Sequence, residues 1–90
     1  MSEPITEEGR LLKKFLQLKK IEGICKFWID DDNVDDGEKI WIMLVWDLSW
    51  AIGFSEPESK IRSMKNKLRS EIKDVLGLDV EVGGHTIKNC

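Results

Sequence analysis

The chain has 90 residues, of which 41% are hydrophobic and 34% are charged, a balance typical of one small folded domain and not of a disordered segment. Its formal net charge of −3 excludes a global positive field that would draw the chain to nucleic acid or to an anionic membrane. The sequence therefore predicts a single α+β domain over residues 1–90, with a flexible amino terminus at 1–5 and a frayed end at 89–90.

The amino-terminal residues are acidic and lack the apolar core of a signal peptide, and no apolar run is long enough to cross a bilayer. The two cysteines, Cys25 and Cys90, do not form a disulfide framework, because Cys90 is the last residue, where chain ends usually fray. We therefore expect reduced thiols, a cytoplasmic location and no contact with a membrane.

The first predicted element is an amphipathic helix over about 6–20, in which apolar residues recur at the helical three-to-four spacing. Gly23 ends this pattern, and the β-branched and aromatic run 24–29 predicts a strand. The segment 30–37 is rich in turn-forming residues and is predicted as a hairpin connection. Three side chains of the strand are expected to face the helices: Cys25, Phe27 and Ile29.

The strongest strand signal lies at 40–46, which is apolar on both alternating faces and therefore predicts a central strand covered on each side. A long second helix follows it. Ser55 and Glu58 have the spacing of a capping box, and Pro57 suits the first helical turn. Gly77 is expected to end this helix in the left-handed conformation.

The carboxyl-terminal segment alternates over 78–82, and Gly83 with Gly84 suits a tight hairpin turn before a short return strand at 85–88. The predicted element order is therefore αββαβ(β). Because strands joined by short turns pair antiparallel, the predicted fold class is α+β, with a small antiparallel sheet of three or four strands and two amphipathic helices packed on one face.

Acidic residues crowd the connection 30–38 and raise the question of a calcium site. They are Asp30, Asp31, Asp32, Asp35, Asp36 and Glu38. An EF-hand loop needs an oxygen ligand at position three and Glu at position twelve, but a loop that starts at Asp32 has Val34 and Met43 there. We therefore predict a solvated hairpin tip that keeps the apolar strands soluble, with a weak cation site of another kind as the alternative.

Recognisable catalytic and cofactor motifs are missing from the sequence. The single histidine, His85, is far along the chain from Cys25, and one His with two Cys cannot supply four zinc ligands. The glycines match no phosphate-binding loop. A dyad of Cys25 and His85 is the alternative to an inert, buried Cys25. The sequence therefore predicts no enzyme, no catalytic residue, no cofactor and no metal site.

The four tryptophans suggest an interaction surface, because two helices cover only one face of a sheet and large exposed aromatic side chains dominate protein interfaces. We therefore predict a non-enzymatic interaction module that forms a homodimer or docks a protein partner. The residues expected to bind the partner are Trp28, Trp41, Met43 and Val45. In the alternative arrangement, the first helix and the final hairpin wrap both faces, and all four tryptophans belong to the core.

RNA binding through the basic outer faces of both helices is the second functional hypothesis. On the second helix its candidate residues are Lys60, Lys65, Lys67, Arg69 and Lys73. The element order is similar to the KH-like fold of small ribosome-associated proteins, but the sequence has no GXXG loop, so no residue role is transferred. A charged outer face is also the ordinary solvated side of an amphipathic helix.

Overall fold

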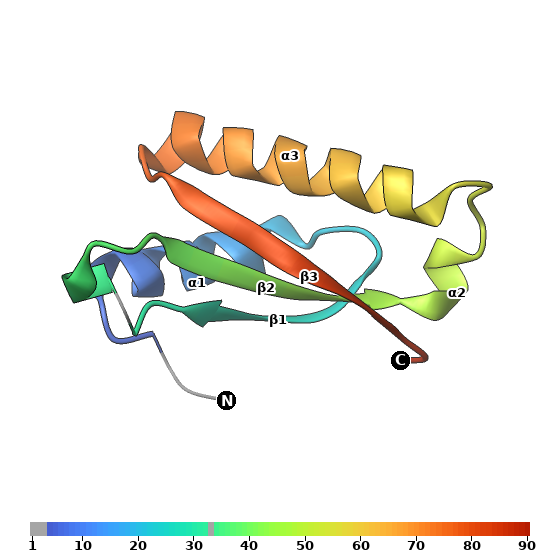
Figure 1. Cartoon of the computed structure of the whole chain (residues 1–90), viewed down its shortest axis with the longest axis horizontal. Helices are drawn as coiled ribbons and strands as arrows, with labels where there is room; N and C mark the ends of the chain where they lie inside the picture. The colour runs from blue at the N-terminus through green and yellow to red at the C-terminus, as the bar shows by residue number, and fades with distance from the viewer. Residues whose placement is uncertain (1–3, 33) are drawn as a thin grey trace.

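The computed structural model of the chain describes residues 4–32 and 34–90, apart from the side chains of Asp35 and His85. Two long helices and a sheet account for most of the fold, and Figure 1 shows their arrangement. The elements in chain order are α1 (Glu7–Lys19), β1 (Ile24–Asp30), the 3-10 helix η1 (Val34–Asp36), β2 (Ile40–Asp47), the short helix α2 (Leu48–Ala51), α3 (Pro57–Leu76) and β3 (Val80–Lys88).

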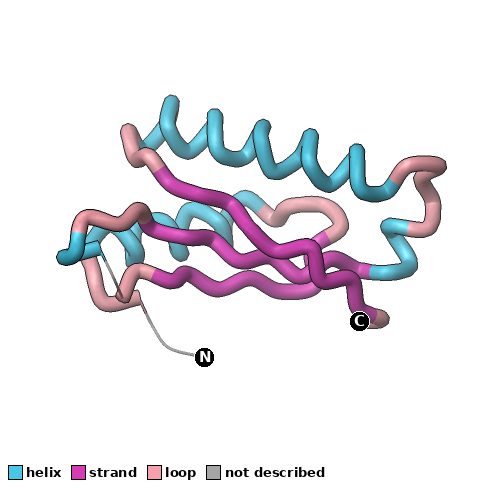
Figure 2. The backbone as a smooth tube through the Cα atoms, in the orientation of Figure 1, coloured by secondary structure: helices cyan, strands magenta, loops and turns pink. Residues whose placement is uncertain are grey.

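The sheet has three strands in the order β1-β2-β3, so β2 is central, as its apolar sequence predicts (Figure 2). The α+β class is confirmed. β1 and β2 pair antiparallel, with Trp28 opposite Met43. The prediction of an entirely antiparallel sheet is wrong, because β3 pairs parallel to β2, with Val82 beside Ile42. The reason is the crossover through α3, which returns the chain to the same end of the sheet, whereas a short turn would reverse it.

β3 continues through the two glycines at which the sequence suggests a hairpin turn, and the predicted return strand does not form. Gly84 has a φ of 99° and lies at a bulge, where the pairing shifts between Met43 and Val45. A Cβ atom at Gly84 would overlap the backbone carbonyl of Leu44. Glycine is therefore required at Gly84 for close approach to β2 and not for a chain reversal.

The core lies between one face of the sheet and the two long helices. The buried residues that form it are Leu12, Leu16, Ile29, Ile40, Ile42, Leu44, Trp46, Ile61, Leu68, Ile72 and Val80. Trp46 stacks on Trp50 with 5.4 Å between ring centroids, and Trp50 meets Phe54 edge to face at 4.8 Å. Trp46 and Trp50 therefore belong to the covered side of the molecule.

The ends of the helices agree only in part with the sequence signals. Gly77 adopts the left-handed conformation after α3, with a φ of 70°, as predicted. The predicted capping box is wrong, because Glu56 and not Ser55 is the N-cap of α3, and no side chain caps it. At α1 the hydroxyl of Thr6 accepts a hydrogen bond of 2.9 Å from the Gly9 amide and caps the helix.

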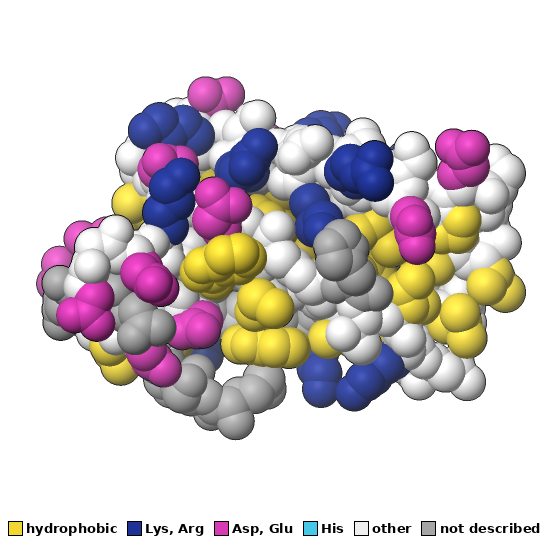
Figure 3. All heavy atoms as spheres, in the orientation of Figure 1, with side chains coloured by type: hydrophobic (Ala, Val, Ile, Leu, Met, Phe, Trp, Pro, Cys, Tyr) yellow, Lys and Arg dark blue, Asp and Glu magenta, His cyan; other side chains and the backbone are white. Residues whose placement is uncertain are grey.

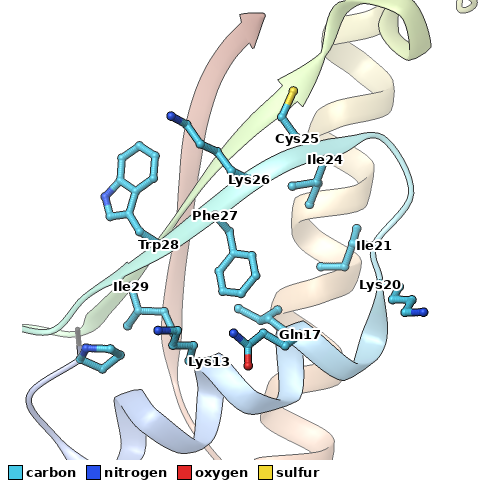
Figure 4. A pocket seen from close by; sticks show the side chains of 12 residues that line it. Lys13, Gln17, Lys20, Ile21, Ile24, Cys25, Lys26, Phe27, Trp28 and Ile29 are labelled. Atoms are coloured by element: carbon cyan, nitrogen blue, oxygen red, sulfur yellow. The ribbon is translucent and has the colours of Figure 1, made fainter. Parts of the chain in front are cut away.

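The cysteines depart from the predicted reduced state, because Cys25 and Cys90 form a disulfide, with 6.0 Å between their Cα atoms. The predicted orientation of Cys25 is also wrong. A bulge places Ile24 opposite Trp46 and Lys26 opposite Val45, so Cys25 is an extra residue whose side chain points away from α1 (Figure 4). A disulfide is typical of oxidising compartments, so the predicted cytoplasmic location loses the support that it drew from reduced thiols.

None of the helices in the described part of the chain is long and apolar enough to cross a membrane. The first three residues of the predicted flexible terminus lie outside the described residues. Of the other two, Pro4 is buried and the Ile5 amide donates to both carboxylate oxygens of Asp31 at 3.1 Å.

Candidate functional site

The side of the sheet opposite α1 and α3 carries its side chains in three rows, which the strand register sets. We call this surface the open face. Its middle row is Trp28, Met43 and Gly83, the row toward one end is Lys26, Val45 and Thr86, and the row toward the other end is Asp30, Trp41 and Glu81. The four residues predicted to bind a partner are thus brought together on one face.

Trp41 is the most accessible of these four side chains, with 41% of its surface exposed. Trp28 and Met43 are half-buried. Val45 is 2% exposed, so its side chain offers a partner almost no surface, in contrast to the prediction. In Figure 3, hydrophobic side chains gather over the middle of the sheet, with charged side chains around them. The open face is therefore an apolar surface with a charged border.

The indole of Trp41 packs closely against Gly83, which has no side chain. A Cβ atom built at Gly83 would lie 3.1 Å and 3.2 Å from two carbon atoms of the Trp41 ring, and 3.4 Å from the Met43 sulfur. A side chain here would press on both residues, so the position of the indole depends on the absence of one.

Acidic residues border the exposed indole. Asp30 and Glu81 stand beside Trp41 on the neighbouring strands. Glu81 is held from the outside by Lys39 at 3.4 Å and by Arg69 at 3.9 Å. Hydrogen bonds from Lys39 to Asp79 and then to Glu81 raise the pKa of Lys39. The β3 side of the open face is therefore already neutralised by its own cations, whereas Asp30 lies on the β1 side.

A groove of about 660 Å³ runs between α1 and the outer edge of β1. Ile24, Phe27 and Ile29 point from β1 toward α1 and form its apolar floor, whereas Lys26 and Trp28 point to the open face (Figure 4). The cations that line the groove are Lys13, Lys20 and Lys26, and no carboxylate is found among those of its lining residues that the structure describes. Within the described residues β1 pairs only with β2, so its outer edge offers unpaired backbone groups.

Asp31 has a structural role that the sequence reasoning missed, because it was grouped with the acidic connection. It is 1% exposed and accepts hydrogen bonds from the Thr6 hydroxyl at 2.6 Å and the Thr6 amide at 2.8 Å. Burial alone would raise the pKa of Asp31, but these hydrogen bonds, with the one from the Ile5 amide, outweigh it and lower the pKa. Asp31 therefore fastens the start of α1 to the end of β1.

The acidic connection does not assemble a cation site among the side chains that the structure describes. Among the described residues, the one group of acidic, Cys or His side chains close enough together to hold a metal ion lies elsewhere. It consists of Cys25, Asp47 and Cys90. Its two sulfur atoms are bonded to each other, so they offer no thiolate ligands in this form. For the same reason Cys25 is not a free nucleophile, and the side chain of His85 lies outside the described residues.

The five candidate RNA-binding residues lie on two different flanks of α3. Lys60 and Lys67 line a second groove toward α1, and the ammonium of Lys60 stands 5.4 Å over the Phe54 ring. Helical periodicity places Lys65, Arg69 and Lys73 on the flank toward β3. On that flank Arg69 pairs with Glu81, and burial, with the nearby Arg62, lowers the pKa of Lys65. The structure does not bring the five residues together.

Comparison of the chain with protein families, with curated proteins and with solved structures found no match.

Proposed function

We propose that this chain is a non-enzymatic protein-interaction module that self-associates or docks a protein partner through the open face of its sheet. One observation supports the proposal most strongly. Trp41 is 41% exposed although it belongs to the central strand of the sheet, and Trp28 and Met43 lie beside it on a face that no helix of the described chain covers.

The physical reason is the free energy that remains in the exposed aromatic surface. An indole exposes or buries on the order of 200 Å², so covering the accessible part of Trp41 is worth about 2 kcal/mol before the costs of association. Trp and Met side chains at the centre of a patch and charged side chains at its border are also the usual anatomy of a protein interface. The open face has this composition.

RNA binding remains the alternative function, and its residues are Lys60, Lys65, Lys67, Arg69 and Lys73. It is less favoured because these cations lie on two flanks of α3, and at least one of them is paired with an acidic residue of β3. Phosphate contacts gain from a continuous basic surface, since each contact adds to the release of counterions.

The test compares two variants that each remove one exposed apolar side chain. Trp41→Ser alters the open face, and Leu18→Ser is its control, because Leu18 is 74% exposed on α1. Proteins retained from a nuclease-treated extract on the immobilised chain are identified, purified and titrated against each variant by calorimetry. We expect Trp41→Ser to weaken binding at least about tenfold, and Leu18→Ser to leave it unchanged.

Equal affinities of both variants for every confirmed partner would show that the open face is not used. A second pair of substitutions, Lys65→Glu with Arg69→Glu, tests the alternative. If RNA is retained by the wild type at low salt and lost from this double variant while Trp41→Ser has no effect, the module binds RNA and the proposal is wrong.

A further inference from the structure

We infer that one partner of this module is a second copy of this chain, joined edge to edge through β1 about a two-fold axis, so that the two three-stranded sheets become one continuous sheet and Trp41 stays free for further binding. The inference rests on the proposed function, since Trp28 of the open face lies at the centre of the contact. The observation that suggests it is the outer edge of β1, which no strand of the described chain pairs. Beside it lies a groove whose described lining residues include lysines and no acidic residue.

The side chains of β1 select one register for this pairing. A two-fold axis perpendicular to the sheet keeps both open faces on the same side, so Lys26, Trp28 and Asp30 of one copy meet only the same three residues of the other. With the axis at Trp28, each Lys26 stands opposite Asp30 of the second copy, and the two Trp28 indoles meet. With the axis at Lys26, two ammonium groups would oppose each other.

Neither Lys26 nor Asp30 takes part in an ion pair within the described part of the chain, and both side chains are exposed. Both are therefore available to a second copy. Opposite charges placed directly across an antiparallel pair stabilise it, whereas like charges there destabilise it. The pairing at Trp28 satisfies both lysines and both aspartates at once.

Charge complementarity extends beyond the strand itself. The lysines of the groove include Lys20, just before β1, and Lys26, near its start, whereas the acidic connection 30–38 follows its end. In an antiparallel pair the end of one strand lies beside the start of the other. The acidic connection of each copy is thereby placed next to the lysines of its neighbour, which also steers the two copies together.

The proposed contact covers the groove, the outer backbone edge of β1 and part of the open face. Side chains from β1 of the second copy come to lie over Phe27 and Ile24 on the groove side, and Trp28 is covered on the open face. The backbone groups of the outer edge gain partners, which removes the hazard of an unpaired edge. Trp41 and Met43 stay accessible, and two copies of the open face now form one larger surface.

The experiment is a charge exchange read by sedimentation velocity and light scattering at several concentrations. The wild type is expected to dimerise, whereas Lys26→Glu and Asp30→Lys should each raise the dissociation constant at least about tenfold, because each places like charges opposite each other twice. Lys26→Glu combined with Asp30→Lys in one chain should restore the dimer. An equimolar mixture of the two single variants should form a heterodimer, in which both pairs are again opposite in sign.

Lys73→Glu is the matched control, because Lys73 is exposed on α3 and far from β1, and it should dimerise as the wild type does. Circular dichroism of each variant checks the fold, and a non-reducing gel excludes dimers linked through Cys25 or Cys90. The inference is overturned if the wild type is monomeric up to about 1 mM, if the single variants dimerise normally, or if the mixture of the two stays monomeric.

The two proposals fail in different ways. A monomeric wild type that still binds another protein in a manner that depends on Trp41 overturns the second copy as the partner and leaves the interaction module in place. If such a monomer binds an acidic extended peptide along the β1 edge, the occupant of the groove is a peptide strand and not a second copy. If Trp28→Ser and Trp41→Ser change neither dimerisation nor any other binding, the proposed function itself is wrong.

Discussion

The two faces of the sheet are built from alternate residues of the same central strand, yet they end in different environments. Ile42 and Trp46 point toward the helices and are fully buried, whereas Trp41 points the other way and is 41% exposed. Both sets are apolar, so hydrophobicity does not distinguish them. The difference is that, within the described residues, α1 and α3 lie on one side of the sheet only, so the apolar residues on the other side keep an accessible surface.

The largest effect is expected from the removal of a tryptophan side chain on the covered face, in comparison with the same change on the open face. Trp46→Ala removes a fully buried indole that stacks on Trp50 and donates to the Gly84 carbonyl at 3.3 Å. It should lower the free energy of unfolding by about 3–5 kcal/mol. Trp41→Ala should lower it by less, about 1–2 kcal/mol, because a large part of this side chain is already exposed. Urea denaturation of a dilute sample measures both values.

An equal loss of unfolding free energy in Trp46→Ala and Trp41→Ala would contradict the proposed difference between the two faces. A loss of several kcal/mol in Trp41→Ala would assign Trp41 to the folding core and remove it from an interaction surface. Trp28→Ala is the intermediate case, since Trp28 is half-buried, and its cost should fall between the other two.

An intermediate effect is expected at Asp31, whose hydrogen bonds hold the start of α1 against the end of β1. Asp31→Asn replaces the carboxylate that accepts from Thr6 and Ile5, and it should cost about 1–3 kcal/mol near neutral pH. The folded-state pKa of Asp31 lies below the ordinary value of 3.8. Its contribution is therefore fully present above that pH and is lost as the pH falls through the folded-state pKa.

Unfolding free energies of the wild type and of Asp31→Asn, measured from neutral to acidic pH, check this sign. The difference between the two proteins should shrink as the medium becomes more acidic than the ordinary pKa of the carboxyl group. A difference that stays constant or grows toward acid would mean that Asp31 is held by contacts that do not depend on its charge.

The smallest effect on stability is expected at Gly83, where a substitution changes the open face alone. Gly83→Ala adds one methyl group within 3.1–3.4 Å of Trp41 and Met43, on a strand backbone without a positive φ. The unfolding free energy should change by less than about 1 kcal/mol, but the indole must shift, which changes its fluorescence and its accessibility to a soluble quencher. Gly77→Ala does not serve as the control, because φ is 70° there. Ser70→Ala on the exposed side of α3 does.

The sequence predicted the two long helices, the first two strands and the side on which the open-face residues lie, because these depend on local patterns. The period of two in the strands placed Trp28, Trp41, Met43 and Val45 on one side, and the structure agrees. The pairing of β3 was not predictable in this way. Its direction depends on how α3 crosses the sheet, and the sequence 80–88 has the same alternation whether it pairs parallel or antiparallel.

Other features were missed because they join residues far apart in the sequence. The disulfide links Cys25 to Cys90 across a separation of 65 residues, and the bulge that turns Cys25 outward has no sequence signal in β1 itself. Asp31 looked like one more acid of the connection 30–38, although Thr6, which caps α1, is its partner. A hydroxyl at a helix start and a carboxylate at a strand end form such a pair only after the fold brings them together.

The crossover through α3 also bears on the order in which the chain folds. β1 and β2 adjoin through a short connection, so they can pair early, at a small loss of chain entropy. We expect β3 to join β2 after α3 has formed, because the two strands pair across the whole α3 crossover and contacts between residues so far apart tend to form late. Until then the edge of β2 that β3 will pair is open, so we expect the chain to be most prone to aggregation before its last strand arrives.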